Sequence, residues 1–165
     1  MHRFFMAALR GGIATAILFG LFGQLVILPT TAADEVDRFP PYAPYAVPYT
    51  AAAIVGVACV QIVLAAAWKL LGMVERDAIF SSAAFRWLDV IIGSTVAATV
   101  LALAVGCHLM LADVPSPDDG MELIGALAAA TGTAGIGACL VMLFVIMRGL
   151  LSKAHTMKSE LAEVV

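Results

Sequence analysis

The stretch VIIGSTVAATVLALAVGCHLMLA, residues 90–112, decides the fold, because it contains no Asp, Glu, Lys or Arg. A helix rises about 1.5 Å per residue, so about 20 apolar residues cross a hydrocarbon core of about 30 Å. The stretch therefore allows one crossing but not two. Three further uncharged runs occupy residues 11–33, 39–68 and 123–147. The sequence thus predicts an all-α fold, an integral membrane four-helix bundle.

The composition agrees with a membrane location. Hydrophobic residues make up 62% of the chain, charged residues only 13%, and the mean hydropathy is +1.01, whereas soluble domains have about a quarter of their residues charged. The apolar composition makes the lipid bilayer the expected partner, and the net charge of −3 argues against nucleic acid or another strongly charged partner. We expect a single membrane domain over residues 1–165, with short loops and a cytoplasmic helical extension over 149–165. Its spans are expected at about 6–28, 47–71, 87–112 and 121–148.

The distribution of basic residues predicts the orientation, because cytoplasmic loops are enriched in Lys and Arg. Arg38 alone falls on one side, among acidic residues. The other basic residues all fall on the opposite side: Arg3, Arg10, Lys69, Arg76, Arg86, Arg148, Lys153 and Lys158. We therefore expect a multi-pass protein of the bacterial inner (cytoplasmic) membrane with both termini in the cytoplasm.

The N-terminal run also has features of a signal peptide, with Arg3 and Arg10 before an apolar stretch and small residues at 31–33. The apolar stretch 11–28 is longer than the usual h-region of about 7–15 residues. This length favours an uncleaved first span, and the mass of the mature protein would test it.

Small residues recur at every fourth position in the first and fourth spans. They are Gly12, Ala16 and Gly20 in the first span, and Gly125, Ala129, Thr133 and Gly137 in the fourth. Such a row lines one helix face and lets another backbone approach closely. The row is interpreted either as packing within one bundle or as an interface between copies of the chain.

Two segments on the acidic side are expected to be loops. Prolines crowd residues 30–49, which predicts an extended, polyproline-like connection into the second span. We interpret it as a stiff connector with interfacial tyrosines, or alternatively as a ligand-docking surface. Residues 113–120 form a short acidic turn without the alternating ligands of a calcium loop.

The connection between the second and third spans carries the most specific local motif. Its members are Asp77, Phe80, Ser81, Phe85, Arg86 and Asp89. Ser81 has the position of an N-cap, and Phe80 and Phe85 have the positions of a hydrophobic staple. Arg86 and Asp89 are three residues apart, which suits a surface ion pair. The motif predicts a sharp turn into the third span.

The helical pattern continues beyond the fourth span. Apolar residues with alternating spacings of four and three include Leu150, Met157 and Leu161. This is a heptad seam, too short to establish a coiled coil by itself. The tail could pack on the inner connection, lie on the membrane surface or pair with another chain.

Few residues in the spans could carry chemistry. Gln24 and Gln61 are interpreted as inter-helical hydrogen-bonding residues, or alternatively as the lining of a substrate path. His108 lies near the outer end of the third span, whereas His2 and His155 lie on the other side, which argues against a bis-histidine haem. We expect no cofactor, no metal site and no catalytic residue. Cysteines 59, 107 and 139 have no paired spacing and are interpreted as packing residues.

The segment from Asp77 to Gly93, with Ile79-Phe80-Ser81, Phe85-Arg86-Trp87-Leu88 and Asp89, resembles the signature of the domain-of-unknown-function family numbered 2975. This resemblance implies a small bacterial protein with four membrane helices and no established activity. Some members are similar to proteins encoded beside helix-turn-helix regulators, which implies a regulatory partner. The Ala- and Val-rich composition suggests an actinobacterial member.

The uncharged span centres, the small-residue faces and the patterned tail favour a non-enzymatic protein that acts through protein contacts. It would be an accessory subunit or regulatory partner of another membrane protein, or a homo-oligomer. The alternative is a small transporter or channel with a polar path near Gln24 and Gln61.

Overall fold

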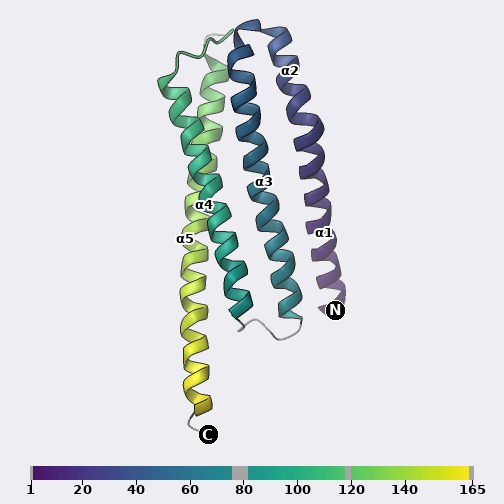
Figure 1. The fold of residues 1–165 in the computed structure, drawn as a ribbon, viewed down its shortest axis with the longest axis vertical. Coiled ribbons are helices and arrows are strands. Elements are labelled where there is room, and N and C mark those ends of the chain that lie inside the picture. The colour runs from purple at the N-terminus through teal and green to yellow at the C-terminus, as the bar shows by residue number, and fades with distance from the viewer. Residues whose placement is uncertain (1, 76–81, 118–119, 164–165) are drawn as a thin grey trace.

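The computed structural model describes residues 2–75, 82–117 and 120–163. Its elements, in chain order, are α1 (His2–Phe22), the π-helical turn η1 (Gly23–Ile27), α2 (Leu28–Arg38), the 3-10 turn η2 (Pro40–Tyr42), α3 (Ala43–Val74), α4 (Ser82–Leu111) and α5 (Met121–Glu163). Because α1, η1 and α2 join end to end, the chain forms four long rods (Figure 1). Each rod is long and apolar enough to cross a membrane. The prediction of an all-α four-helix bundle is confirmed.

The rods pack in the order of the chain, and the arrangement is open on one side. α5 packs on α4, α4 packs on α3, and α3 packs on α1 and α2 (Figure 1). Within the described part of the chain, no backbone contact joins α5 to α1 or α2. The first and last rods therefore leave a gap, which a closed ring of four helices would not have.

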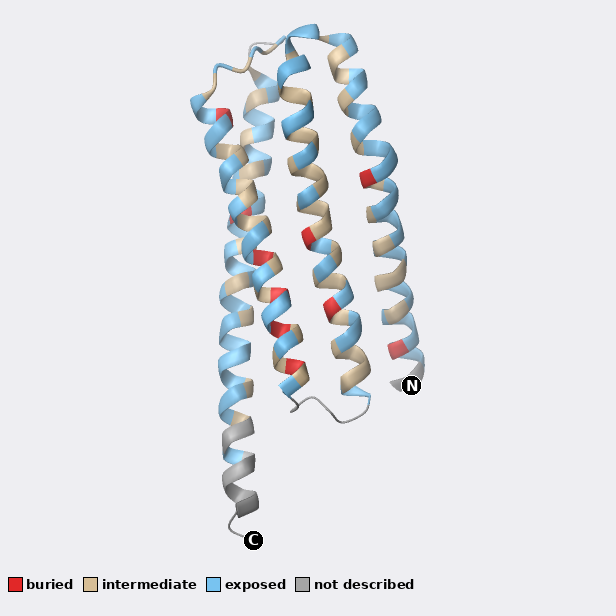
Figure 2. Ribbon diagram, in the orientation of Figure 1, coloured by how far each residue is buried: buried red, intermediate tan, exposed pale blue. Residues whose placement is uncertain are grey.

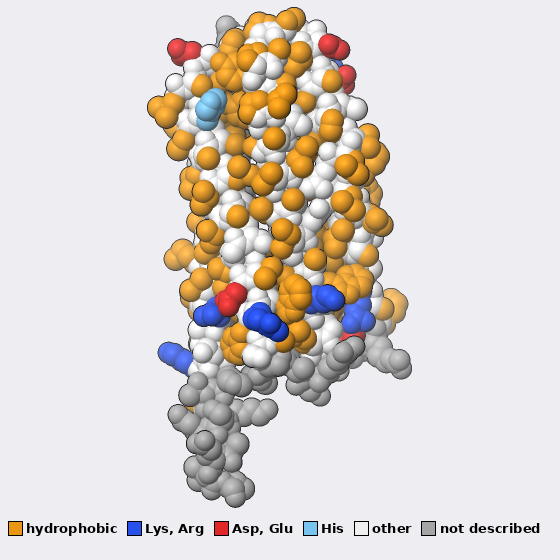
Figure 3. All heavy atoms as spheres, in the orientation of Figure 1, with side chains coloured by type: hydrophobic (Ala, Val, Ile, Leu, Met, Phe, Trp, Pro, Cys, Tyr) orange, Lys and Arg blue, Asp and Glu red, His pale blue; other side chains and the backbone are white. Residues whose placement is uncertain are grey.

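The buried core is narrow and follows one face of α4. Ala84, Leu88, Ile91 and Thr95 are buried there at spacings of four and three, which is the spacing of a single helix face. Large apolar side chains elsewhere point outward on every rod. Most of the ribbon is coloured as exposed or intermediate in Figure 2, and hydrophobic side chains are spread over the face shown in Figure 3. Such a surface is suited to lipid, because water would disfavour so much exposed apolar area.

The two ends of the bundle differ in charge, and we name them accordingly. The acidic end carries Asp34, Glu35, Asp37, Asp113 and Glu122. The basic end carries Arg10, Lys69, Arg86 and Arg148, and Lys and Arg side chains gather there in Figure 3.

The expectation of an extended proline-rich loop over residues 30–49 is wrong. α2 continues to Arg38, and α3 begins at Ala43 with Pro48 inside it. The prolines are tolerated because most of them lie in the first turn of a helix, where a backbone N–H has no intrahelical partner. Pro40 and Pro41 start η2, and Pro44 lies in the first turn of α3.

Two ion pairs tie neighbouring rods together at the basic end. Arg10 Nη2 lies 2.6 Å from Glu75 Oε2, joining α1 to the end of α3. Arg148 donates from Nε and Nη2 to the two carboxylate oxygens of Asp89, joining α5 to α4. The predicted partner of Asp89 is therefore wrong, because no ion pair in the described part of the chain joins it to Arg86. The spacing of three residues on α4 permits a pair between Arg86 and Asp89. The packing of α5 on α4 instead brings Nε and Nη2 of Arg148 to the Asp89 carboxylate.

Most residues of the predicted N-cap and hydrophobic staple are not among those that the structure describes. Asp77, Phe80 and Ser81 lie outside the described residues. Phe85 lies in the first turn of α4, half-buried, and Arg86 is exposed.

The tail continues α5 as one straight helix. α5 projects past the ends of the other rods at the basic end (Figure 1). Leu150 and Met157 are 63% and 59% exposed, and the side chain of Leu161 lies outside the described part. The seam residues Leu150 and Met157 are therefore free to meet another surface.

Candidate functional site

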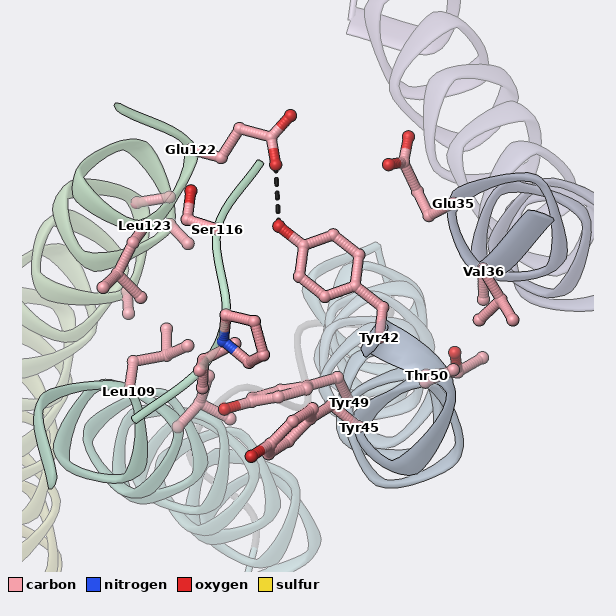
Figure 4. A pocket seen from close by; sticks show the side chains of 18 of the residues that line it. Glu35, Val36, Tyr42, Tyr45, Tyr49, Thr50, Leu109, Ser116, Glu122 and Leu123 are labelled. Atoms are coloured by element: carbon pink, nitrogen blue, oxygen red, sulfur yellow. Dashed lines mark hydrogen bonds between the residues drawn. The ribbon is translucent and has the colours of Figure 1, made fainter. Parts of the chain in front are cut away.

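A cavity of about 560 Å³ lies at the acidic end, in the gap between α2 and α5. α3, the end of α4 and the connection after it close its other sides (Figure 4). The lining is mainly Ala, Val, Leu and Tyr, with few polar groups. This size and character match those of binding sites for small apolar ligands, which usually measure about 300–1,000 Å³.

The wall from α5 makes room for the cavity because its side chains are small. Ala126, Ala129, Ala130 and Thr133 line it at helical spacings of three, one and three. Ala129 and Thr133 belong to the small-residue row of the fourth span, so part of that row faces a cavity and not a second backbone. Gly125 has no neighbour within 4 Å of an added Cβ.

The opposite wall comes from α2, and the turn η1 determines which face of α2 is directed toward the cavity. The π-helical turn contains one residue more than an α-helical turn, so it rotates the following helix by about 100°. Ala32, Glu35 and Val36, at spacings of three and one, then line the cavity. Pro29, two residues after η1, has no N–H to donate to the carbonyl oxygen of residue 25 within this turn, and it is the signal that the sequence offers for it.

Three tyrosines form the base and the mouth of the cavity. Tyr42, Tyr45 and Tyr49 follow each other at spacings of three and four and all line it. Tyr42 Oη donates to Glu122 Oε2 at 2.8 Å, so η2 is linked to α5 across the mouth (Figure 4). Tyr49 Oη lies 2.8 Å from His108 Nδ1, which links α3 to α4. Two of the tyrosines thus link elements at the acidic end, η2 to α5 and α3 to α4.

The mouth carries negative charge from both sides of the gap. Glu35 projects from α2 and Glu122 from the first turn of α5 (Figure 4). Glu35 also lies 3.8 Å from Arg38, in a pair whose side chains are 44% and 77% exposed. Among the lining residues that the structure describes, none is Lys or Arg.

The small residues of the first span do not act as one row. An added Cβ at Gly20 would lie 2.7 Å from Gln61 Nε2 on α3, whereas Gly12 has nothing within 4 Å. Ala16 is exposed. On α5, Gly137 faces Thr99 of α4, again at a close approach. Close packing therefore occurs at Gly20 and Gly137, inside the bundle.

The two intramembrane glutamines lie below the cavity and do not line it. Gln24 is 8% exposed, and its Nε2 donates to the carbonyl oxygen of Ile54 on α3 at 3.0 Å. Gln61 Nε2 is buried and has no hydrogen-bond partner among the described residues. Gln24 thus joins η1 to α3, whereas Gln61 packs against Gly20 without that bond.

Replacing Gln24 with leucine is expected to lower the free energy of unfolding by about 0.6–2 kcal/mol, because it removes a hydrogen bond between helices. The matched variant Gln61→Leu should cost less, since Nε2 of Gln61 makes no bond. Unfolding in mixed micelles by increasing fractions of a denaturing detergent measures both. Equal losses in the two variants would contradict the role given to Gln24.

His108 is engaged by Tyr49 and is exposed. Within the residues that the structure describes, no group of three His, Cys, Asp or Glu side chains is placed to hold a metal ion. The described cysteines 59, 107 and 139 are free thiols, the first of them buried.

Sequence reasoning missed the residues that build the cavity. It assigned Glu35 and Glu122 only to the charge asymmetry, and it favoured a connector with interfacial tyrosines over a ligand-docking surface for the proline-rich segment. The spacing of Tyr42, Tyr45 and Tyr49 was the available signal, since it places all three on one helix face. The prolines between them obscured it.

The fold and the cavity define the class: small all-α proteins with four helices long enough to cross a membrane and an apolar cavity at one end. Comparison with known families narrows this class. The family DUF2975, described as a protein of unknown function, matches residues 30–165. The chain therefore belongs to the DUF2975 family. No curated protein and no solved structure matches it.

Proposed function

We propose that this protein acts through protein contacts, as an accessory subunit or regulatory partner of another membrane protein. The observation that supports it best is the continuity of α5. This single helix runs from Met121 at the cavity to Glu163 beyond the other rods. A displacement of its outer part would therefore reach the exposed side chains of Leu150 and Met157 without crossing a loop.

The orientation belongs to the same proposal. We place the basic end and both termini in the cytoplasm and the cavity on the outer side of a bacterial, by composition actinobacterial, inner membrane. The clustering of Lys and Arg at one end supports this, because positive charge is retained on the cytoplasmic side. The tail is then available to cytoplasmic or membrane-bound partners.

The alternative of a transporter or channel has less support. Its expected path runs near Gln24 and Gln61, and neither residue lines the cavity. Gln24 is bonded to a neighbouring helix, which makes it a structural contact.

The tail can be tested by crosslinking in intact membranes. A photoreactive residue at position 154, which lies on the same seam, is expected to give one adduct of defined mass. The double variant Leu150→Glu with Met157→Glu should abolish that adduct, because two charges on an apolar contact face must be desolvated. Ser152→Glu, on a different face of the helix, is the matched control and should retain it.

The chain must remain folded for this result to count, so the thermal unfolding of each variant in mild detergent is measured alongside. A chain that is strictly monomeric and gives no adduct from the seam would overturn the proposal. An adduct of twice the chain mass would identify the partner as a second copy.

A further inference from the structure

We propose that the cavity at the acidic end binds a cationic amphiphile, with an apolar chain inside the cavity and an ammonium group at its mouth. This inference is independent of the tail and goes beyond the proposed function, because binding would persist if the tail had no partner. Three properties of the site carry it: the apolar wall, the opening toward the membrane and the charge of the mouth.

The apolar wall fits a hydrocarbon chain. Ala126 and Ala129 of α5 face Val36 of α2, and Leu109 and Leu123 complete the surface. These side chains offer no hydrogen bonds, so a polar molecule would lose its hydration there without compensation. A flexible apolar chain loses nothing of this kind.

The opening lies on the side where the rods do not meet. α5 has no backbone contact with α1 or α2 among the described residues, and both α2 and α5 line the cavity. A chain dissolved in the bilayer can therefore enter sideways between them. A site closed on all sides would need a helix to move first.

The mouth selects the sign of the head group. Glu35 and Glu122 approach it from opposite walls, and no Lys or Arg is found among its described lining residues. Glu122 retains a second carboxylate oxygen beyond the one bonded to Tyr42. The pair between Glu35 and Arg38 is long and exposed, and such pairs hold their partners weakly.

The tyrosines strengthen the preference for a cation. Tyr42 stands between the two carboxylates in Figure 4, and aromatic ring faces attract ammonium groups. A phospholipid, in contrast, would bring its phosphate against Glu35 and Glu122. The phosphate and the two carboxylates would repel each other because all are negatively charged. We therefore commit to an ammonium amphiphile without an anionic group.

The test uses a decylammonium probe with a photoreactive diazirine in the chain, added to the full-length protein in maltoside micelles. After irradiation, peptide mapping is expected to find the label on the α2 and α5 walls. Excess decyltrimethylammonium should compete, and decyl sulfate should not. The same diazirine chain with an uncharged hydroxyl head is the reference probe.

Two double variants separate the cavity from the general charge of this end. Glu35→Gln with Glu122→Gln is expected to reduce labelling about tenfold, the effect of losing two partly exposed charge contacts. Asp34→Asn with Asp37→Asn removes the same charge from residues that do not line the cavity. This control should change labelling less than about twofold, because exposed charges beyond the mouth are screened.

A third variant tests occupancy without changing charge. Ala129→Leu places a larger side chain in the cavity and should reduce labelling by both the charged and the uncharged probe. Thermal unfolding of each variant shows whether it is folded. Equal labelling by the two probes, or unchanged labelling in the glutamine double variant, would overturn the proposal and leave a cavity filled by lipid chains.

Discussion

Gly137→Ala is expected to lower the free energy of unfolding by about 1–3 kcal/mol, the cost of overpacking a well-packed contact. An added Cβ at Gly137 would meet the hydroxyl oxygen of Thr99 and lie 3.2 Å from its Cβ and 3.4 Å from its Cγ2. Thr99 has little freedom to move, because its hydroxyl donates to the carbonyl oxygen of Thr95 at 2.8 Å. α4 and α5 would therefore have to separate.

Gly135→Ala is the matched control on the same helix. Nothing lies within 4 Å of an added Cβ at Gly135, so this variant should be neutral or gain up to about 1 kcal/mol from the lower flexibility of alanine. Unfolding of both variants in mixed micelles gives the comparison. A loss at Gly137 no larger than the change at Gly135 would mean that α4 and α5 are not in close contact there.

Thr99→Ala supplies the rescue. It removes the Oγ1 and Cγ2 atoms that an alanine at position 137 would meet, while Thr99 Cβ remains. The double variant should recover at least about 0.5 kcal/mol relative to the sum of the single changes, the coupling expected of residues in contact. This coupling is specific to the contact and would not follow from a general loss of helix stability.

The sequence was sufficient to predict the four rods, because each depends on a local property. A run such as residues 90–112 has no charge, and the bilayer leaves a helix as its main way to satisfy backbone hydrogen bonds. The rods are longer than the predicted spans; α3, for example, covers Ala43–Val74. Helices can extend past the hydrocarbon core because hydropathy marks the lipid boundary and not the helix end.

The prediction of an extended loop over residues 30–49 was wrong for a reason that can be read in the local sequence. Proline suits the first turn of a helix and is disfavoured in the interior, although Pro48 lies inside α3. The positions of Pro40 and Pro44 are compatible with two successive helix starts as well as with an extended chain. The structure selects the first of these, with η2 over Pro40–Tyr42 and α3 from Ala43.

The cavity could not be predicted, because its walls come from distant parts of the chain. Glu35 and Glu122 are far apart in sequence, and the rotation at η1 directs α2 toward α5. The sequence shows the rows of small residues, but the position of the neighbouring helix determines which of these residues are in close contact with it. Gly137 meets Thr99, whereas Gly12 meets nothing within 4 Å.

Val100→Asp is expected to cost about 2.5–3.5 kcal/mol in membrane integration, the cost of an aspartate at the centre of a span. Val100 lies near the middle of the run 90–112 and its side chain is 58% exposed. On a water-soluble bundle, such an exposed position would tolerate aspartate within about 0.5 kcal/mol. The substitution therefore distinguishes lipid from water around α4. Resistance of the membrane-bound protein to carbonate extraction, together with thermal stability in lipid nanodiscs, measures the effect.

Met110→Asp is the control that fixes the depth. Met110 is 76% exposed and lies on the same helix near the acidic end, so its carboxylate can reach the interface at little cost. Val100→Ala controls for the loss of the valine itself and should retain full integration. A large loss at position 100 with little change at 110 is the result that a membrane-spanning α4 requires. Two equally small effects would place this helix in water and overturn the membrane assignment, however apolar its sequence.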